Sequence, residues 1–358
     1  MKRTIKVAAA MAMIAGSAAA ANLENPLYMP RQGDVYSKIS AGLMYKKAND
    51  NLVMQAKDHA GATEFPIWRG ALDIGYGITD RLAVRGQFAY THDGDINRQG
   101  MNNGRLGLIF RALDGRVTDG WIWDVYADAH LGGISKMEAE LIATNTAALM
   151  QGYPLTFNYD NYSNGRWGVW AGTRVGKTFD NLTVAAFGEV LHTFGNDNTN
   201  IKVSLSARDR VALVANTMFA GSGAPIAAAL PNSFAVETKS TWEYNVGVSA
   251  LYQIDRTWSV GGGFTYKNRA ENNVKSVDVD FALSPPYDAI ANGLIDGLTG
   301  PLQDGIKEYI LTAVVAYQLT DIVQVAIYGE YTFDDAQPKS QNGTDVKVEG
   351  GVRMNIAF

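Results

Sequence analysis

Apolar and polar residues alternate with a period of two over most of the chain. Residues 345–358 show this most clearly, because the apolar positions 346, 348, 352, 354, 356 and 358 alternate with Lys347, Glu349, Arg353 and Asn355. Successive side chains of a β-strand lie on opposite faces of a sheet, so this segment has one apolar and one polar face. The pattern predicts a strand that separates two different environments.

Twelve segments show this alternation, and they cover residues 33–48, 65–79, 82–92, 103–113, 121–134, 164–179, 181–195, 239–254, 257–268, 307–320, 322–334 and 345–358. Most of them are longer than the roughly five or six residues of a typical strand in a soluble protein. Their length matches the roughly 9–11 residues with which a tilted strand crosses a bilayer. Alternation also occurs around residues 234–236 and 277–281, which extends some strands past the bilayer or gives a fourteen-stranded alternative.

The connections between these segments are short and long in turn. Short turns follow every second segment, and four of them contain an aspartate whose carboxylate can accept hydrogen bonds from the backbone just downstream: Asp80, Asp180, Asp255 and Asp321. The long connections include residues 135–163, 196–238 and 269–306. This order predicts an all-β, antiparallel, up-and-down transmembrane barrel of about twelve strands with long external loops. We expect the apolar stretches at 208–230 and 286–306 to form short helices that narrow or cap the mouth.

Tryptophans lie at the ends of the predicted strands. Trp68, Trp167 and Trp242 are next to long loops, whereas Trp121 and Trp258 are next to short turns. Two aromatic bands at the edges of an apolar belt are typical of a barrel that faces lipid. A soluble β-sandwich also alternates apolar and polar residues, but its strands are shorter and its apolar face forms a core. The pattern therefore favours a membrane barrel, in which the sheet must close because lipid offers no hydrogen bonds.

Residues 1–21 have the features of a secretory signal peptide. Three basic residues within positions 2–6 precede an apolar stretch over residues 7–15, and Ala19 and Ala21 occupy the small-residue positions before a cleavage site ahead of Asn22. We expect export through the Sec pathway, with residues 22–358 forming a single barrel domain.

The composition narrows the possible functions. The chain has 358 residues, of which 47% are hydrophobic and 19% are charged. Its longest apolar run, over residues 7–21, is shorter than the roughly 18 residues that suggest a membrane-spanning helix. The formal net charge of −5 argues against nucleic-acid binding, which requires a basic surface. The absence of cysteine excludes disulfides, thiol catalysis and thiolate metal sites.

The signal peptide, the alternating strands and the terminal aromatic residue Phe358 together resemble a Gram-negative outer-membrane β-barrel protein of the porin-like kind. In that class, a final strand that ends in an aromatic residue resembles the signal read by the barrel-assembly machinery. The resemblance implies a location in the cell outer membrane, with membrane lipid and the assembly machinery as partners. It points to no particular subfamily, solute or oligomeric state.

The phase of the predicted strands places many charged residues on the inner face of the barrel. We expect a water-filled lumen of mixed charge through which ions or small solutes diffuse passively. A barrel of twelve strands is wider than one of eight, which side chains can fill. The expected pore-lining residues are Arg69, Asp73, Arg85, Arg105, Arg111, Asp124, Asp128, His130, Arg174, Glu189, Glu330, Glu349 and Arg353.

The sequence is also compatible with two alternatives to an open channel. Salt bridges could fill the interior, so that the protein is a non-conducting adhesin or structural barrel that acts through its loops. The apolar loops could instead admit hydrophobic solutes. The arginines of the lumen are similar in kind to those of twelve-stranded porins for acidic saccharides, which suggests a preference for anions, although acidic neighbours such as Glu349 oppose it.

Catalysis is not expected from this sequence. Asp128 and His130 share a strand face and could hydrogen-bond to each other, but nothing supplies a nucleophile elbow or an oxyanion site. We therefore expect no enzymatic activity, no cofactor and no metal site.

Overall fold

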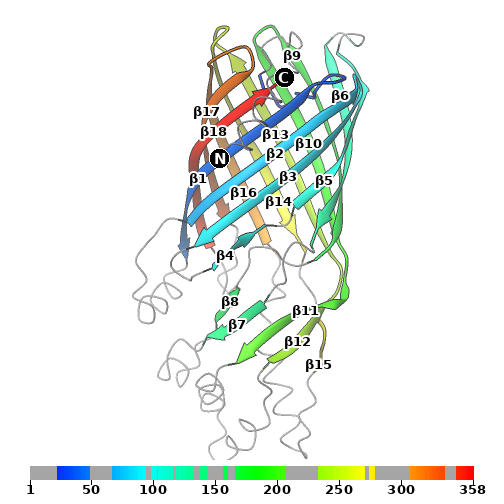
Figure 1. Cartoon of the computed structure of the whole chain (residues 1–358), viewed down its shortest axis with the longest axis vertical. Coiled ribbons are helices and arrows are strands. Elements are labelled where there is room, and N and C mark those ends of the chain that lie inside the picture. The colour runs from blue at the N-terminus through cyan, green and yellow to red at the C-terminus, as the bar shows by residue number, and fades with distance from the viewer. Residues whose placement is uncertain are drawn as a thin grey trace, which may run out of the picture.

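Twelve long antiparallel strands close into a barrel (Figure 1). The computed structural model describes residues 22–48, 67–93, 98–102, 104–115, 118, 120–132, 138–142, 156–159, 166–205, 233–270, 274–278, 306–334 and 344–358. The barrel strands are β1 (Val35–Ala48), β2 (Ile67–Thr79), β3 (Leu82–Asp93), β5 (Gly104–Leu113), β6 (Trp121–Leu131), β9 (Gly168–Phe179), β10 (Leu182–Thr193), β13 (Thr241–Gln253), β14 (Trp258–Arg269), β16 (Ile306–Gln318), β17 (Val323–Asp334) and β18 (Thr344–Ala357). These strands confirm the predicted architecture, and the fourteen-stranded alternative is wrong.

The ring closes between the first and the last strand. Val35 N donates to Phe358 O at 2.7 Å, and Phe358 N donates to Val35 O at 3.0 Å. Both termini of the barrel sheet therefore lie at the end that carries the short turns, as an even number of strands requires. A short strand, β4 (Arg98–Met101), continues the pairing of β5 along the loop end of β3.

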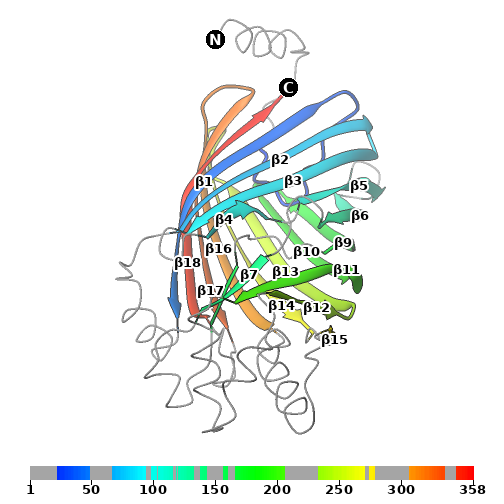
Figure 2. The same cartoon turned by 60° about the horizontal axis from the view of Figure 1, so that its bottom comes forward.

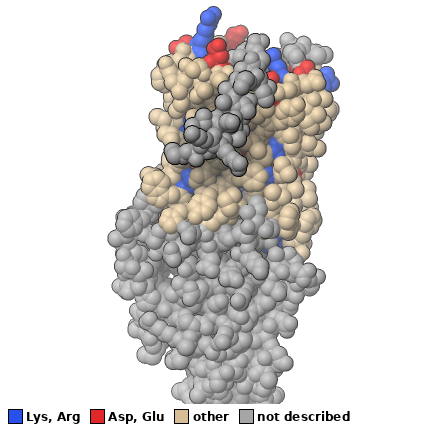
Figure 3. All heavy atoms as spheres, in the orientation of Figure 1, with Lys and Arg blue, Asp and Glu red and all other residues tan. Residues whose placement is uncertain are grey.

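The barrel is apolar on the outside and charged on the inside. Trp68 and Ile327 on the outer wall are 60% and 66% exposed, whereas Asp124 and Asp128 on the inner face are 0% and 2% exposed. Figure 3 shows an outer wall with few charged groups, and Lys, Arg, Asp and Glu side chains that gather at the short-turn end. A soluble protein would bury the first set and expose the second, so this outer wall is suited to lipid.

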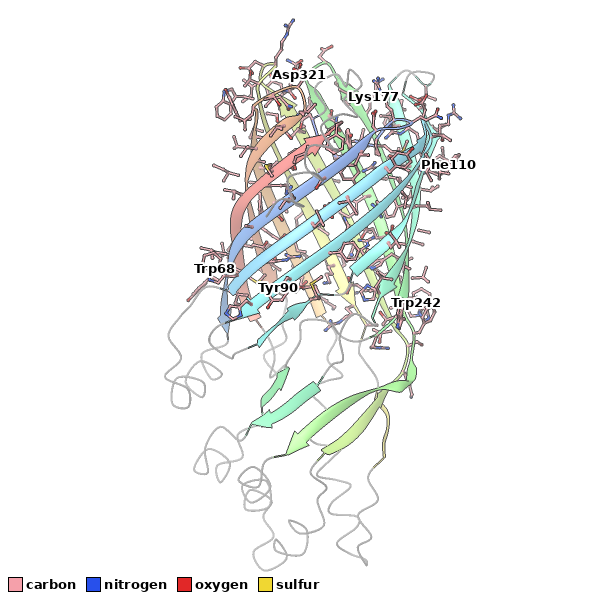
Figure 4. The ribbon with its side chains drawn as sticks, in the orientation of Figure 1. Trp68, Tyr90, Phe110, Lys177, Trp242 and Asp321 are labelled. Carbon is pink, nitrogen blue, oxygen red and sulfur yellow. The ribbon has the colours of Figure 1, made fainter. Side chains whose placement is uncertain are left out.

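Aromatic residues lie at both edges of the outer wall. Trp68 and Trp242 lie near the end with the long loops, and Phe110 lies near the short-turn end (Figure 4). Trp121 and Trp258, which begin β6 and β14, are also exposed next to short turns. The two predicted aromatic bands are therefore present.

The short turns differ in detail from the expected aspartate turns. The turn at Asp255 forms as expected. Asp255 Oδ1 accepts hydrogen bonds from the N–H groups of Thr257 and Trp258 at 2.7 and 2.8 Å, and these bonds lower the pKa of Asp255. In the turns at 79–82 and 320–323, a threonine hydroxyl accepts these bonds instead. Asp180 contributes through its backbone, which adopts a left-handed φ of 46°.

A second sheet, of five strands, lies beyond the barrel at the end with the long loops (Figure 1, Figure 2). It contains β7 (Glu138–Ile142), β8 (Thr156–Tyr159), β11 (Asn196–Leu205), β12 (Ser233–Thr238) and β15 (Val274–Asp278). The alternating residues at 234–236 and 277 thus belong to strands outside the barrel. The expected helices at 208–230 and 286–306 fall outside the described residues, except for Ile306 in β16. Within the described part, no helix is long and apolar enough to cross a membrane.

Two glycines face each other where β1 meets β18. Gly42 and Gly351 are direct register partners, and Tyr328 of β17 lies against both of them. A Cβ atom at Gly351 would lie 2.4 Å from Ala41 O, which is closer than real side chains come to a backbone oxygen. The close approach of the two strands therefore depends on glycine at this position.

We expect Gly351→Val to weaken barrel closure by about 1–3 kcal/mol, because an overpacked side chain displaces the backbone. Gly350→Val is the matched control, since a Cβ atom at Gly350 has no neighbour closer than 3.8 Å. Heat-modifiable gel migration across a urea titration measures the folded fraction. Equal unfolding midpoints for the two variants would contradict this account of the seam.

Candidate functional site

Residues 22–34, which precede β1, lie inside the barrel at its short-turn end; we call them the N-terminal segment. Leu23 and Leu27 are 1% and 3% exposed, and Met29 packs with Ala83 of the inner wall. The alternation predicted the first strand from residue 33, two residues before β1 begins at Val35, and it did not extend to residues 22–32. The apolar side chains of the segment are nevertheless as buried as a protein core, whereas residues 31–33 at the rim are exposed.

Arginines of the inner wall bind the backbone of the N-terminal segment. Arg174 Nη1 donates to Pro26 O at 2.9 Å, and Arg174 Nη2 donates to Tyr28 O at 2.7 Å. Arg111 Nη2 donates to Leu27 O at 2.7 Å. Three consecutive carbonyl groups therefore accept from charged donors, which satisfies polar groups that would otherwise be buried without a partner.

Glu24 brings a carboxylate from the segment to β18. Arg353 Nη1 lies 3.1 and 2.8 Å from its two oxygens, and Asn355 Nδ2 donates to Oε1 at 2.8 Å. Burial raises the pKa of Glu24, but the charges of Lys38 and Arg353 and these hydrogen bonds outweigh burial and lower the pKa below its ordinary value. Glu24 is therefore a charged attachment of the segment to the wall.

Asn22 attaches the first residue of the segment. Its side chain hydrogen-bonds to those of Gln253 at 2.7 Å, Ser259 at 3.2 Å and Gln324 at 3.0 Å. At the other end of the segment, the backbone of Gly77 hydrogen-bonds to residues 33 and 34. The segment is thus held along its length by strands from several parts of the ring.

One layer of ion pairs in the lumen is centred on Asp124 of β6. Arg111 Nε donates to Asp124 Oδ1 at 2.8 Å, and Arg174 Nε donates to Asp124 Oδ2 at 2.8 Å. The register places Asp124 directly opposite both arginines, one on β5 and one on β9. Because the same arginines bind residues 26–28, Asp124 orients the donors that hold the N-terminal segment.

A second layer, centred on Asp128 of β6, lies closer to the loops. Asp128 accepts hydrogen bonds from Arg85 at 2.9 and 2.6 Å and from Arg105 at 2.7 Å. Tyr126 Oη donates to Glu189 at 2.8 Å, and the Tyr126 ring lies 4.3 Å from the guanidinium carbon of Arg85. Pairing and stacking therefore fill the side of the lumen formed by β3, β5, β6, β9 and β10.

His130 and Asp128 have different partners, so the hydrogen bond considered between them is not formed. Trp170 Nε1 donates to His130 Nδ1 at 3.2 Å, and the Trp170 ring lies 4.3 Å from the guanidinium carbon of Arg105. Asp128 is shared by two arginines and does not orient the histidine as a base. Among the described residues, no group of His, Cys, Asp and Glu could hold a metal ion.

Other expected pore-lining residues lie on β2, β17 and β18. Arg69 Nη1 donates to Glu349 Oε2 at 3.0 Å, and Tyr328 Oη donates to Glu349 Oε1 at 3.2 Å. Asp73 lies directly opposite Lys38 in the β1–β2 register. Glu24, Tyr126, Trp170 and Tyr328 contribute to these interactions although the strand pattern did not single them out.

Strands β14 and β16 carry small residues on the lumen face, such as Gly263 and Ala316. Thr312 of β16 faces the lumen, because it alternates with the lipid-facing Leu311 and pairs directly with Glu330, and yet it is exposed. Its partner on β17 is Glu330, which accepts a hydrogen bond from Thr332 at 3.3 Å. Solvent thus reaches the lumen face on the side of the ring away from β5 and β6.

This arrangement, with lipid-compatible residues outside and ion pairs inside, decides the class of fold. The chain is an outer-membrane-type β-barrel. An outer membrane channel from Pseudomonas putida F1 has a similar structure, with a TM-score of 0.51 and 12% identity over 94% of this chain and 100% of that one. The NanC porin matches with a TM-score of 0.40 and 10% identity, over 88% of this chain and 98% of that one. The KdgM porin matches with a TM-score of 0.38 and 6% identity, over 90% of this chain and 99% of that one. No protein-family model and no curated protein matches this sequence.

We expect Asp124→Asn to lower the free energy of unfolding of the barrel by about 3–5 kcal/mol, because it leaves two buried arginines without their carboxylate. Asp321→Asn removes the same charge from an exposed turn and serves as the control. Urea unfolding monitored by gel migration measures the difference. A loss below 1 kcal/mol, roughly that of a surface pair, would show that this layer does not support the fold.

The attachment of the N-terminal segment is expected to weaken in acid. The lowered pKa of Glu24 means that its carboxylate stabilises the inserted segment at neutral pH, and that this contribution is lost as the pH falls through the lowered value. The charges that act on Glu24 most strongly are those of Lys38 and Arg353, and Asp73 lies opposite Lys38. Hydrogen exchange of residues 22–34, corrected for intrinsic rates, should therefore increase on acidification. Glu24→Gln should abolish most of this pH dependence, and an unchanged profile in that variant would contradict the assignment.

Proposed function

We propose that this protein is a passive diffusion channel of the Gram-negative outer membrane. In this proposal, residues 1–21 direct export through the Sec pathway and are removed, and the barrel-assembly machinery reads the final strand with Phe358 at its end. Ions or small polar solutes then move down their gradient through the lumen, and no reaction is catalysed.

The observation that carries this proposal is the polar lumen face that solvent reaches beside an ion-paired wall. Thr312 is exposed although it points inward, and Arg69 retains a side-chain exposure of 32% while it pairs with Glu349. A lumen filled only for stability would gain more from apolar packing than from charges, because each buried ion pays a large desolvation cost. Charges near water instead favour the passage of polar solutes.

The N-terminal segment makes the described conformation a closed one in this proposal. It occupies the short-turn end of the lumen and uses Arg111, Arg174 and Arg353, three of the residues expected to line a pore. Solutes therefore pass only when residues 22–34 move aside. The segment adds a closure at the periplasmic end to the loop elements expected to narrow the external mouth.

A second candidate is a non-conducting surface barrel that acts through its loops. It is favoured by the extent of pairing inside the lumen, since Arg174 binds Asp124, Arg353 binds Glu24 and Glu189 binds Tyr126. The five-stranded sheet beyond the barrel would then be the functional part. Conductance separates the two candidates, because the second requires no ion path.

Planar-bilayer recording of the purified, heat-modifiable protein tests the channel. We expect unitary currents with a reversal potential that indicates a preference for anions. Arginine side chains line much of the lumen, and their charged groups remain partly exposed to water. A protein without residues 22–34 should conduct for a larger fraction of time than the full mature chain. The absence of unitary current in both proteins would favour the surface barrel, and cation preference would contradict the selectivity.

A further inference from the structure

The contact of Glu24 with the wall has the composition of a ligand site. Arg353 and Asn355 of β18 bind both oxygens of one carboxylate, and Lys38 of β1 adds a second positive charge beside it. In the β1–β18 register, Lys38 lies directly opposite Asn355. The two donors and the charge of Lys38 therefore belong to the barrel wall, whereas the carboxylate belongs to the N-terminal segment.

Neighbouring residues of the wall support Arg353 and Asn355. The guanidinium carbon of Arg353 lies 4.8 Å from the centre of the Tyr328 ring, and Tyr328 is itself bonded to Glu349. Asn355 is 0% exposed, and its Nδ2 also donates to Gln324 of β17 at 2.9 Å. Tyr328 and Gln324 of β17 therefore support Arg353 and Asn355 from the wall, and Gln324 also binds Asn22 of the segment.

Charge balance requires an anion at this place. Lys38 and Arg353 are the charged groups that act on Glu24, and both are positive, while Asp73 opposite Lys38 supplies one negative charge. Departure of Glu24 would leave the group with a net positive charge facing the lumen, and this charge favours the binding of another anion. An anion that binds here can do so only when Glu24 is absent, so its binding favours the open lumen.

We propose that Lys38, Arg353 and Asn355 form a binding site for the carboxylate of a solute, and that Glu24 occupies this site as an internal ligand in the closed channel. A small carboxylate displaces Glu24, the N-terminal segment leaves the lumen, and the solute itself thereby opens its path to the periplasmic side. This inference rests on the proposed channel function and adds the class of solute and its coupling to opening.

Glucuronate and glucose provide a matched pair of probes, because they share the sugar ring and differ in the carboxylate. We expect glucuronate to increase the open probability of the mature protein in a planar bilayer by about tenfold at saturation, and glucose to leave it unchanged. Hydrogen exchange of residues 22–34 should increase with glucuronate and not with glucose. The second measurement reports release of the segment whether or not current flows.

Glu24→Gln is the decisive variant, because it keeps the shape of the side chain and removes its charge. We expect this variant to be open about tenfold more often without any solute, and glucuronate to bind it more tightly than the unmodified protein because no internal carboxylate competes. Asp321→Asn, with the same charge change in an exposed turn, should behave like the unmodified protein. Arg353→Gln should lose the response to glucuronate.

The outcomes separate this inference from the proposed function. If unitary currents occur but glucuronate has no greater effect than glucose on current and on exchange, the Glu24 contact is only a structural ion pair and the inference is overturned. If none of the variants conducts, the channel function fails, and the inference fails with it. A response to glucuronate that persists in Arg353→Gln would show that the carboxylate binds at another place, and it would overturn the assigned site.

Discussion

Every backbone N–H and C=O group that faces hydrocarbon must find its partner within the protein, and the structure depends on this constraint. The sheet satisfies it by closing β18 onto β1, so no strand edge of the ring is left open to lipid. Closure creates an interior, and the period of two sends the polar side chains into it. The exposed apolar wall and the buried charges are therefore two consequences of one requirement.

The interior charges create a second requirement, because each of them needs a partner or water. Asp124 and Asp128 each bind two arginines and so have their partners. Arg111 and Arg174 also bind the carbonyl groups of residues 26–28. The N-terminal segment is thus part of the charge balance of the lumen. The same electrostatics that stabilises the wall holds the segment in place, and this links stability to closure.

The strands could be predicted from the sequence because their signal is local and periodic. The alternation at 345–358 is enough to place β18 and its two faces, and the lengths of the connections give the up-and-down order. The position of the N-terminal segment could not be predicted in this way, since Asn22 and Glu24 bind residues more than two hundred positions away. The ion pairs could not be predicted either, because the position of a residue in a strand gives the face of its side chain and not its partner. His130, for example, binds Trp170 and not Asp128.

The described structure is a lipid-facing barrel with a lumen of paired charges and an internal segment at its short-turn end. In the proposed channel, residues 22–34 control passage through the lumen. The most direct measurement uses the absence of native cysteine, by recording current from Asn22→Cys/Ser259→Cys, whose native side chains are 3.2 Å apart. We expect a short cross-link between the two cysteines to abolish opening and its reduction to restore it. Equal currents from the cross-linked and the reduced protein would contradict the claim.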